Sequence, residues 1–493
     1  MKKIFSIIVF SIILSGCSEE FLDRQPEDTL APGIFYNTPA EIKTGLTGVY
    51  ATQQAIHNHG GISAVVELMS DDGSRIGSPG NRVELFYKTT ADSYSSLWND
   101  FFKMIVDANN IIYQIDNFTP ANEAQTTEIN AYRGEACFLR ALSYFYLVRL
   151  YGAVPMFTDP WHDPGTAFGI GRTPVNTIYS DVIIPDLEFA ATNCYKKGDG
   201  ALGNEGARAT KGAAITILGK VYLTIKDYDK ASSTLKRLIV DKEAGNYSLI
   251  SDYGAIFRPE NKFTDESIYE INFNVAAGMP SWYFRNGYSV IYNKYKITNW
   301  NQQFGGLSNL MEEFYNAEDW IRYKESLDSG WHATNNIINP LPIKQFPDLI
   351  VGYIEQFVNT GTDYNYIITR YADALLMYAE ALMFLNQKDL AAGYINQVRA
   401  RADMPPISAS DLDIDRILHE RRMELTFEGH RYFDLVRTGK AIEYIERVYS
   451  IPETPGYWNR TMRTEPIPDY QLILPIPPAE IEKDQTLEQN PGY

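Results

Sequence analysis

The sequence of 493 residues contains little cysteine, a deficit of positive charge and no long hydrophobic run beyond its first residues. None of the three cysteines forms a CxxC pair or a His/Cys cluster, the usual signs of a structural zinc site. A glycine-rich P-loop for phosphate groups is also missing. No later apolar run is long enough to span a bilayer. What remains is a globular chain without sequence signals for zinc, nucleotide or a membrane-spanning helix.

Acidic residues outnumber basic ones, 62 against 44, and give a formal net charge of −18. Attraction to phosphates supplies most non-specific affinity for nucleic acid, so we expect neither nucleic acid nor an anionic membrane surface as a partner. Aromatic residues are plentiful at 13%, with 34 Tyr and 7 Trp. These side chains combine an apolar face with a polar group, which suits ligand surfaces as well as the core.

An export signal opens the chain. Lys2 and Lys3 precede an apolar run over residues 4–14, which has the size of a signal-peptide core and is too short to span a bilayer. The sequence LSGC at residues 14–17 then resembles the lipobox of bacterial lipoproteins, in which the cysteine is lipidated. We therefore predict a signal peptide over residues 1–16, a lipid anchor on Cys17 and an anchored linker over residues 17–36.

The other cysteines, Cys137 and Cys194, lie in segments with a helical pattern. They are either two buried thiols or one disulfide, and the sequence does not choose between these states. His57 and His59 place two imidazoles close together, but no third ligand accompanies them. We therefore predict no metal site and no cofactor.

Helical periodicity is clear in residues 98–115 and again in residues 132–150, where apolar side chains recur at spacings of three, four and seven. The two segments predict a pair of helices, broken at Thr119-Pro120 and ended near residues 152–155.

A sharper pattern begins at Leu218. Leu218-Gly219-x-x-Tyr222, followed by Ala231 and Leu235, has the order and spacing of the tetratricopeptide repeat. Small residues in this motif let two helices approach closely, while the larger ones fill the space around them.

A weaker copy of the same motif covers residues 379–398. Such repeats bury their apolar faces only against neighbouring repeats. We therefore predict an all-α dominated fold, a single domain over residues 37–493, with a tetratricopeptide-like scaffold at about 37–250 and 365–450.

Between about residues 251 and 364 no helical period persists, and prolines, glycines and aromatics crowd together. A structureless loop of this length is unusual in a compact domain, so we expect short helices and strands laid against the scaffold. Binding residues usually lie on segments of this kind. This irregular, aromatic-rich insertion is therefore the predicted ligand-binding part.

Several signatures resemble those of the SusD/RagB family of outer-membrane nutrient-binding lipoproteins. The clearest are RYAD at 370–373, ERRMEL at 420–425, EGHRYFDLVRTG at 428–439 and QNPGY at 489–493. The lipobox and the Leu97-Trp98 pair fit the family's order as well. On these motifs the chain is identified as a member of that family.

The resemblance implies a binding protein without catalytic residues, anchored by lipid in the outer membrane and exposed at the cell surface. It also implies a SusC-like TonB-dependent transporter as partner, to which the protein delivers oligosaccharide or polysaccharide. The transporter would supply the energy for import.

Charged residues in the signatures alternate in sign at helical spacing, which predicts ion pairs that fix how the helices pack. They are Arg370, Asp373, Glu380, Glu420, Arg421, Arg422, Glu424, Arg431, Asp434 and Arg437.

A sugar offers apolar C–H faces and hydroxyls, so its site needs aromatic platforms beside planar hydrogen-bonding groups. A Gly/Ser/Pro-rich loop, where the family often places ligand contacts, and the aromatic segment offer both. The predicted ligand-binding residues are Asp71, Asp72, Arg75, Arg82, Trp282, Tyr283, Tyr288, Tyr292 and Trp300. Trp98 and Trp320 are predicted to pack within the scaffold instead.

Three alternatives stay open at this level. One is the oligopeptide-binding branch of the same family, because peptides also bind aromatic clefts. Another is a glycoside hydrolase, which would need two carboxylates about 5 to 10 Å apart across a cleft. The last is a structural lid on the transporter with little ligand affinity. The sequence does not identify the glycan.

Overall fold

The computed structural model describes residues 35–58, 61–74, 95–160, 169–202, 206–281, 305–306, 308–328, 331–332, 337–338, 341–342, 361–450 and 466–493. The predicted signal peptide, Cys17 and nearly all of the predicted linker lie outside these residues. Within them, no helix combines the length and the apolar character needed to cross a membrane.

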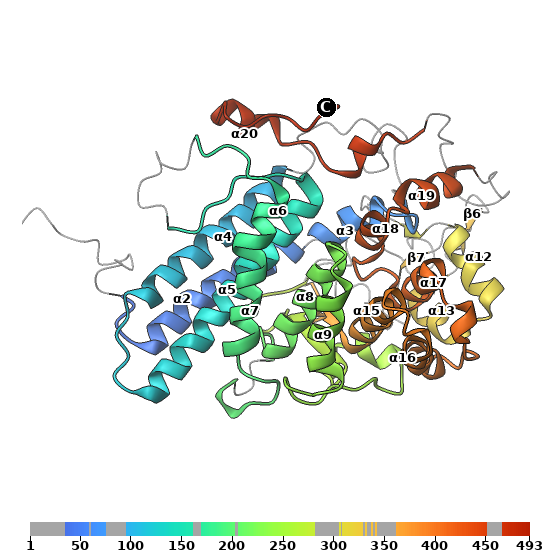
Figure 1. Cartoon of the computed structure of the whole chain (residues 1–493), viewed down its shortest axis with the longest axis horizontal. Helices are drawn as coiled ribbons and strands as arrows, with labels where there is room; N and C mark the ends of the chain where they lie inside the picture. The colour runs from blue at the N-terminus through green and yellow to red at the C-terminus, as the bar shows by residue number, and fades with distance from the viewer. Residues whose placement is uncertain are drawn as a thin grey trace, which may run out of the picture.

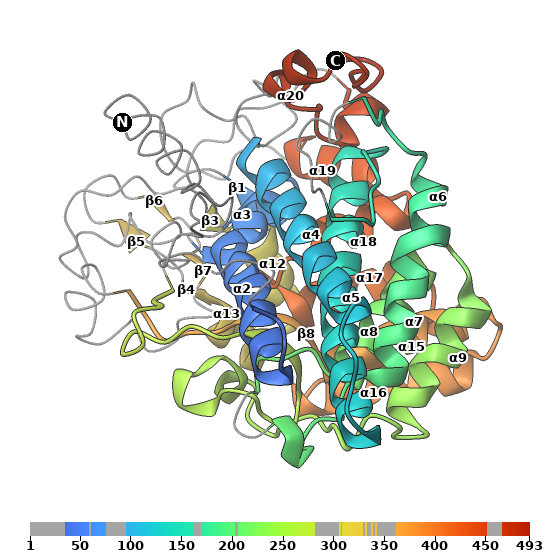
Figure 2. The same cartoon turned by 90° about the vertical axis from the view of Figure 1, so that its left-hand side faces the viewer.

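Helices that follow one another in sequence also pack against one another in space (Figure 1). The series is α2 (Pro39–His57), α4 (Ser95–Asp116), α5 (Glu123–Tyr151), α7 (Ile184–Asn193), α8 (Lys211–Thr224), α9 (Tyr228–Ile239), α15 (Tyr371–Phe384) and α16 (Lys388–Arg401). Each helix contacts the next in the series, and Figure 2 shows α2, α4 and α5 side by side. This stacking confirms the predicted tetratricopeptide-like, all-α scaffold.

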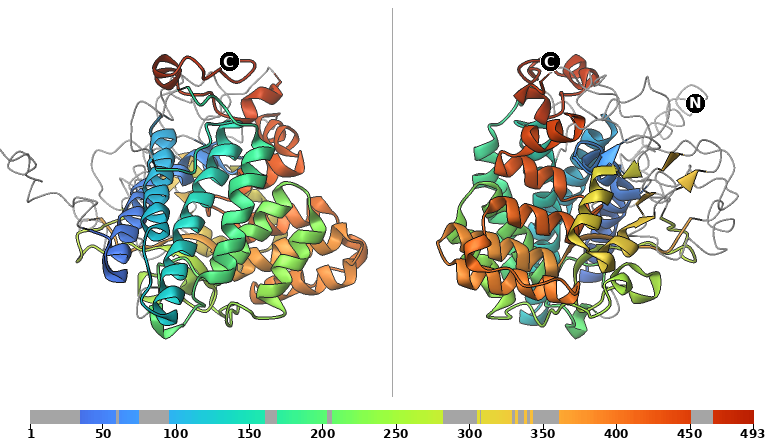
Figure 3. Two further views of the ribbon diagram at one scale, coloured as in Figure 1. Left: turned by 60° about the vertical axis from the view of Figure 1, so that its left-hand side comes forward. Right: turned by 90° about the vertical axis from the view of Figure 1, so that its right-hand side faces the viewer.

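The remaining helices flank this series. They are α3 (Gly61–Leu68), α6 (Val175–Ile178) with a π-helical turn (Tyr179–Ile183), α12 (Ser308–Ala317), α13 (Trp320–Ser326), α17 (Ile414–Leu425), α18 (Arg431–Thr438), α19 (Ala441–Ser450) and α20 (Pro478–Lys483). Short 3₁₀ turns cover Gly200–Leu202, Gly254–Phe257, Pro259–Asn261, Ala409–Asp411 and Asp469–Leu472. Both views in Figure 3 show α20 and the carboxy terminus at one end of the scaffold.

Strands are few and form two-stranded antiparallel ladders. They pair β1 (Gly73–Ser74) with β3 (Gly305–Gly306), β2 (Ser267–Ile271) with β8 (Tyr366–Arg370), β4 (Leu327–Asp328) with β7 (Leu341–Pro342), and β5 (Trp331–His332) with β6 (Ile337–Ile338). Together with α12 and α13, strands β2 to β7 supply the short elements that the sequence predicts between residues 251 and 364.

Local sequence explains where the long helices begin and end. Thr38 and Glu41 form a capping box at the start of α2, and Asn122 caps α5 through its side chain. Gly152 ends α5 with a φ of 75°, a left-handed backbone that glycine adopts without steric cost. The pair α4 and α5 thus confirms the two helices predicted around the break at Thr119-Pro120.

Helices α8 and α9 show why the repeat motif needs its small residues. Gly219, Tyr222, Ala231 and Leu235 are all buried at the contact of the two helices. A Cβ placed on Gly219 would lie 2.6 Å from the Leu235 side chain, closer than atoms can approach without a shift. Glycine therefore sets the spacing of this pair, as the motif predicts.

A buried ion-pair network joins the signatures. The Arg370 guanidinium is fully buried and contacts Glu266 and Glu424 at 2.6 Å and Glu428 at 2.8 Å. Although burial opposes the charged form, these carboxylates hold the pKa of Arg370 well above its ordinary value. Equivalent contacts join Arg322 to Asp319 and Glu420, Arg421 to Asp373 and Asp434, and Arg437 to Glu380 and Asp434. The predicted packing role of the charged signature residues is confirmed.

The structure also shows the state of the two cysteines in the helical scaffold. Cys137 and Cys194 are buried free thiols, which decides between the two states that the sequence left open.

Asn490 of the QNPGY signature donates to the carbonyl oxygens of Tyr151 and Leu474, at 3.0 and 2.8 Å. The signature thereby fastens the carboxy-terminal segment to the end of α5.

Replacing Gly219 with alanine is expected to lower the free energy of unfolding by about 1 to 3 kcal/mol, because the new methyl group overpacks against Leu235. Gly48 on α2 is the matched control, since a Cβ there meets no atom within 4 Å. Gly48→Ala should raise stability by about 0.5 to 1 kcal/mol through helix propensity. Urea denaturation measures both variants, and equal effects would contradict the close approach of α8 and α9.

Candidate functional site

Two predicted ligand-binding stretches meet at a short ladder. Gly73 pairs with Gly306 and Ser74 with Gly305, and Figure 2 shows β1 beside β3. Arg75 follows β1 directly, and the aromatic segment that ends near Trp300 leads into β3. The loop and the aromatic segment therefore extend from adjacent points of the structure.

The residue directly before the aromatic segment, Ser281, is also anchored. Ser281 is 2% exposed and exchanges two backbone hydrogen bonds with Thr362, at 2.8 and 3.0 Å. Trp282 is the next residue. The segment is thus held at Ser281 before it begins and at Gly305 after it ends.

Most predicted ligand-binding residues lie outside the described residues and stay predictions. These are Arg75, Arg82, Trp282, Tyr283, Tyr288, Tyr292 and Trp300.

Asp71 and Asp72 correct the sequence-based prediction, because both are buried rather than presented in an open loop. Their exposed fractions are 2% and 0%. Arg431 donates to both carboxylate oxygens of Asp71, at 2.7 and 2.8 Å, and Arg422 donates to Asp72 at 2.6 Å. Carboxylates paired in this way are not available to a ligand, so they belong to the scaffold beneath the ladder.

The pKa values of the Asp71 and Asp72 carboxyl groups are shifted in opposite directions. Burial alone would raise the pKa of Asp71, but the guanidinium groups of Arg422 and Arg431 outweigh it and hold the pKa below its ordinary value. Burial, reinforced by the neighbouring Asp71 charge, raises the pKa of Asp72 to about 6 against the opposing effect of Arg422. Asp71 is therefore the permanent anion of the pair.

Arg422 also connects residues 71–72 to helix α12. Arg422 pairs with Glu313 on α12. The Glu313 carboxylate in turn lies 2.7 Å from His419 Nδ1. Burial opposes ionisation of Glu313, yet Arg422 and His419 lower its pKa to about 2. Residues 71–72, α12 and α17 are thus joined through one cation directly before β1.

The two tryptophans that the sequence assigns to packing behave differently. Trp98 is 4% exposed and packs against Phe102 and Tyr151, as predicted. Trp320 is 48% exposed, so the packing prediction is wrong for it. Asp319 and Arg322 are buried and share a helix face at i, i+3, which turns the intervening Trp320 away from the interior.

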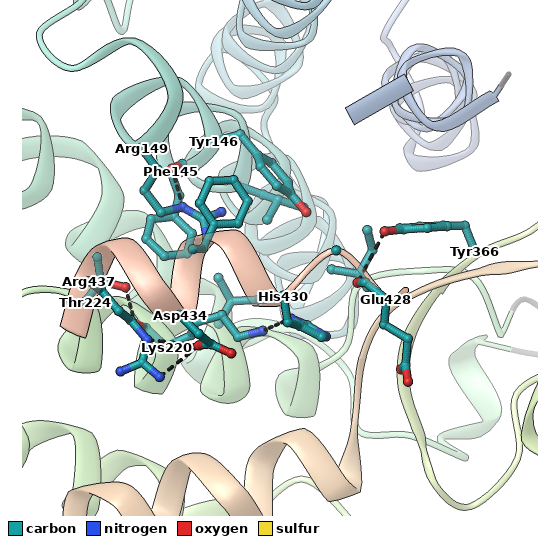
Figure 4. A pocket seen from close by; sticks show the side chains of 15 residues that line it. Phe145, Tyr146, Arg149, Lys220, Thr224, Tyr366, Glu428, His430, Asp434 and Arg437 are labelled. Atoms are coloured by element: carbon teal, nitrogen blue, oxygen red, sulfur yellow. Dashed lines mark hydrogen bonds and ion pairs between the residues drawn. The ribbon is translucent and has the colours of Figure 1, made fainter. Parts of the chain in front are cut away.

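A small cavity of about 30 Å³ lies between α5, α8 and α18 (Figure 4). The Arg149 guanidinium lies over the Phe145 and Phe433 rings, 3.6 and 3.8 Å from their centroids. Lys220 pairs with Asp373 at 2.7 Å and lies 3.2 Å from His430 Nδ1. The cavity has room for little more than a water molecule, so we assign it to the scaffold.

Among the described residues, no group of three or more His, Cys, Asp or Glu side chains is arranged to hold a metal ion.

Replacing Asp71 with asparagine should cost about 3 to 5 kcal/mol of stability, because Arg431 and Arg422 would lose a buried counter-charge. Asp241→Asn is the matched control, since its pair with Lys236 lies at the surface and should contribute less than about 1 kcal/mol. Guanidinium denaturation distinguishes the two. A D71N variant as stable as D241N would contradict the buried assignment.

His430 should make stability depend on pH. Burial first, and then the Lys220 charge, lower the pKa of His430 to about 3. Between pH 6.5 and 3 the unfolded chain therefore binds a proton that the folded chain does not, and stability falls as pH falls, by up to about 1.4 kcal/mol per pH unit. The measurement is the free energy of unfolding of the wild type minus that of His430→Gln, from pH 7.5 to 4.5. A difference that does not shrink on acidification would exclude a neutral His430.

Comparison with known proteins covers most of the chain. The model described as the SusD family matches residues 256–493, and one described as "Starch-binding associating with outer membrane" matches residues 20–223. "SusD-like protein P2" of Formosa agariphila is 27% identical, with both chains covered fully.

Two solved structures have a similar fold. One is described as "Laminarin binding SusD-like protein", with a TM-score of 0.73, 25% identity and 92% and 99% of the two chains covered. "Surface glycan-binding protein A" of Bacteroides fluxus has a TM-score of 0.75, 24% identity and coverage of 92% and 100%. A SusD family model and a SusD-like model match successive parts of this helical-repeat chain, and with the SusD-like relatives they show that the chain belongs to the SusD family.

Proposed function

We propose that the protein is a surface nutrient-binding lipoprotein that captures oligosaccharide or polysaccharide and delivers it to a TonB-dependent transporter in the outer membrane. The observation that carries the proposal is the β1–β3 ladder, from which the predicted loop and the aromatic segment both extend. Because both segments start at this ladder, the planar polar groups of one and the aromatic platforms of the other can contribute to one site. Family membership and the laminarin-binding relative support a glycan as ligand.

Binding without catalysis agrees with the chemistry of the described residues. Asp71 and Asp72, adjacent carboxylates near the proposed site, are buried and paired with arginines. A glycoside hydrolase needs one carboxyl group to protonate the leaving oxygen and a second to act across the sugar. Neither role is open to a carboxylate held in this way.

Weak binding fits the proposed delivery. If each aromatic contact contributes roughly 0.5 to 1.5 kcal/mol beyond area, three platforms with a few net hydrogen bonds give about −4 to −7 kcal/mol. That range corresponds to dissociation constants from about millimolar to ten micromolar. A ligand held at this strength can pass to a transporter without a separate release step.

The lipid on Cys17 and the linker over residues 17–36 complete the proposal. Several acyl chains on one cysteine retain a protein at a membrane far longer than a single chain does. The linker would let the helical body lie above the membrane, next to the SusC-like transporter.

Trp282→Ala and Trp300→Ala should each weaken binding of laminarin or of starch-derived oligosaccharides by about two- to tenfold, since each removes one platform. Calorimetry measures affinity and thermal melting checks the fold. Tyr113→Ala, an exposed aromatic on α4 far from both stretches in sequence, is the matched control and should bind as the wild type does.

Three other results would contradict the proposed function or change the proposed ligand or site. Release of reducing ends from a polysaccharide panel would show a hydrolase. Binding of peptides in place of glycans would assign the chain to the peptide branch. Unfolding of the tryptophan variants would place those side chains in the core.

A further inference from the structure

The cavity between α5, α8 and α18 is lined by a cation that has no acidic partner. Arg149 lies on the last turn of α5, and no carboxylate among the described residues is within ion-pair distance of its guanidinium. Burial lowers the pKa of Arg149 to about 10, so the side chain stays charged at neutral pH. A cation withdrawn from water without a counter-charge is costly, so the cavity favours an occupant of negative charge.

The guanidinium of Arg149 has donors to offer such an occupant (Figure 4). Two aromatic rings, those of Phe145 and Phe433, lie against it with their centroids 3.6 and 3.8 Å away. Its Nε donates to the Phe145 carbonyl oxygen at 2.9 Å. The two terminal nitrogens donate to no described residue, yet both remain accessible. Four N–H groups of one guanidinium are therefore available to a ligand in the cavity.

The other charged groups around the cavity are already matched. Three cations and three carboxylates pair among themselves, namely Lys220, Arg421 and Arg437 with Asp373, Glu380 and Asp434. Glu428 also lines the cavity, but both of its carboxylate oxygens accept hydrogen bonds from Arg370. Arg149 thus adds one positive charge that these carboxylates do not neutralise, which favours a monovalent anion.

The volume of the cavity limits the size of the anion. A space of about 30 Å³ accommodates one or two water-sized occupants. A sugar ring or a tetrahedral oxyanion such as sulfate is larger than this. A water molecule would accept hydrogen bonds from Arg149 but would leave its charge unmatched, whereas a small anion does both.

We propose that the cavity between α5, α8 and α18 binds one small monovalent anion, chloride or an ion of similar size, at the terminal nitrogens of Arg149. The bound anion neutralises the end of α5 where it packs against Phe433 of α18. This inference goes beyond the proposed function and does not depend on it.

The test measures how chloride affects thermal unfolding of the full-length mature protein, with gluconate replacing chloride at constant ionic strength. An anion that binds only the folded chain stabilises it, so about 300 mM chloride should raise the unfolding midpoint of the wild type by about 2 to 4 °C. Arg149→Met removes the charge and leaves an apolar side chain against the two rings. In that variant the effect of chloride should disappear.

Arg133→Met is the matched control. Arg133 also lies on α5 and over an aromatic ring, that of Phe189, but its guanidinium pairs with Asp116. The R133M variant should therefore keep the chloride effect of the wild type.

Bromide locates the ion directly, because its anomalous scattering distinguishes it from water. Wild-type crystals soaked in sodium bromide should show an anomalous peak beside the terminal nitrogens of Arg149. This measurement decides the question even if R149M does not fold.

A chloride effect that is lost in R149M and kept in R133M, together with the bromide peak, supports the anion site. A chloride effect of equal size in R149M, or no bromide peak at Arg149, overturns it and assigns the cavity to water. A peak in a wild type whose midpoint does not respond to chloride shows an adventitious ion only and also overturns it. None of these results involves a glycan, so the proposed function is judged separately.

Discussion

The Arg370 guanidinium is the contact on which the arrangement of the molecule depends. It lies where β8 passes into α15 and is satisfied only when carboxylates converge on it from two other segments: Glu266, directly before β2, and Glu424 and Glu428, at the end of α17 and in the turn after it. An arginine buried without these partners would cost several kcal/mol, so alternative packings are strongly disfavoured. Apolar contacts between helices tolerate small slips, whereas a guanidinium with directed hydrogen bonds does not.

The same principle extends from the scaffold to the site. Arg422 and Arg431 on α17 and α18 fasten residues 71–72, and a backbone ladder fastens the far end of the aromatic segment. The sequences of the loop after β1 and of the aromatic segment can therefore change without disturbing the frame to which both are attached. A rigid frame also reduces the entropy lost on binding, which matters when individual sugar contacts are weak.

Periodicity in the sequence was enough to predict the helices, and the spacing around Gly219 predicted how two of them pack. Pattern could not predict which cation faces Asp71, because Arg431 is 360 positions away in the chain. The exposure of Trp320 follows from a buried Asp319–Arg322 pair whose burial the sequence does not reveal.

The two buried thiols have a consequence for biogenesis. If the chain is exported as proposed, it passes through a compartment that forms disulfides between accessible cysteines. Burial raises the pKa of Cys137 and of Cys194, so in the native protein little of the reactive thiolate forms. Before folding, both thiols are open to the oxidising machinery. Their survival as thiols depends on how fast α5 and α7 close over them, which makes folding rate a condition of correct redox state.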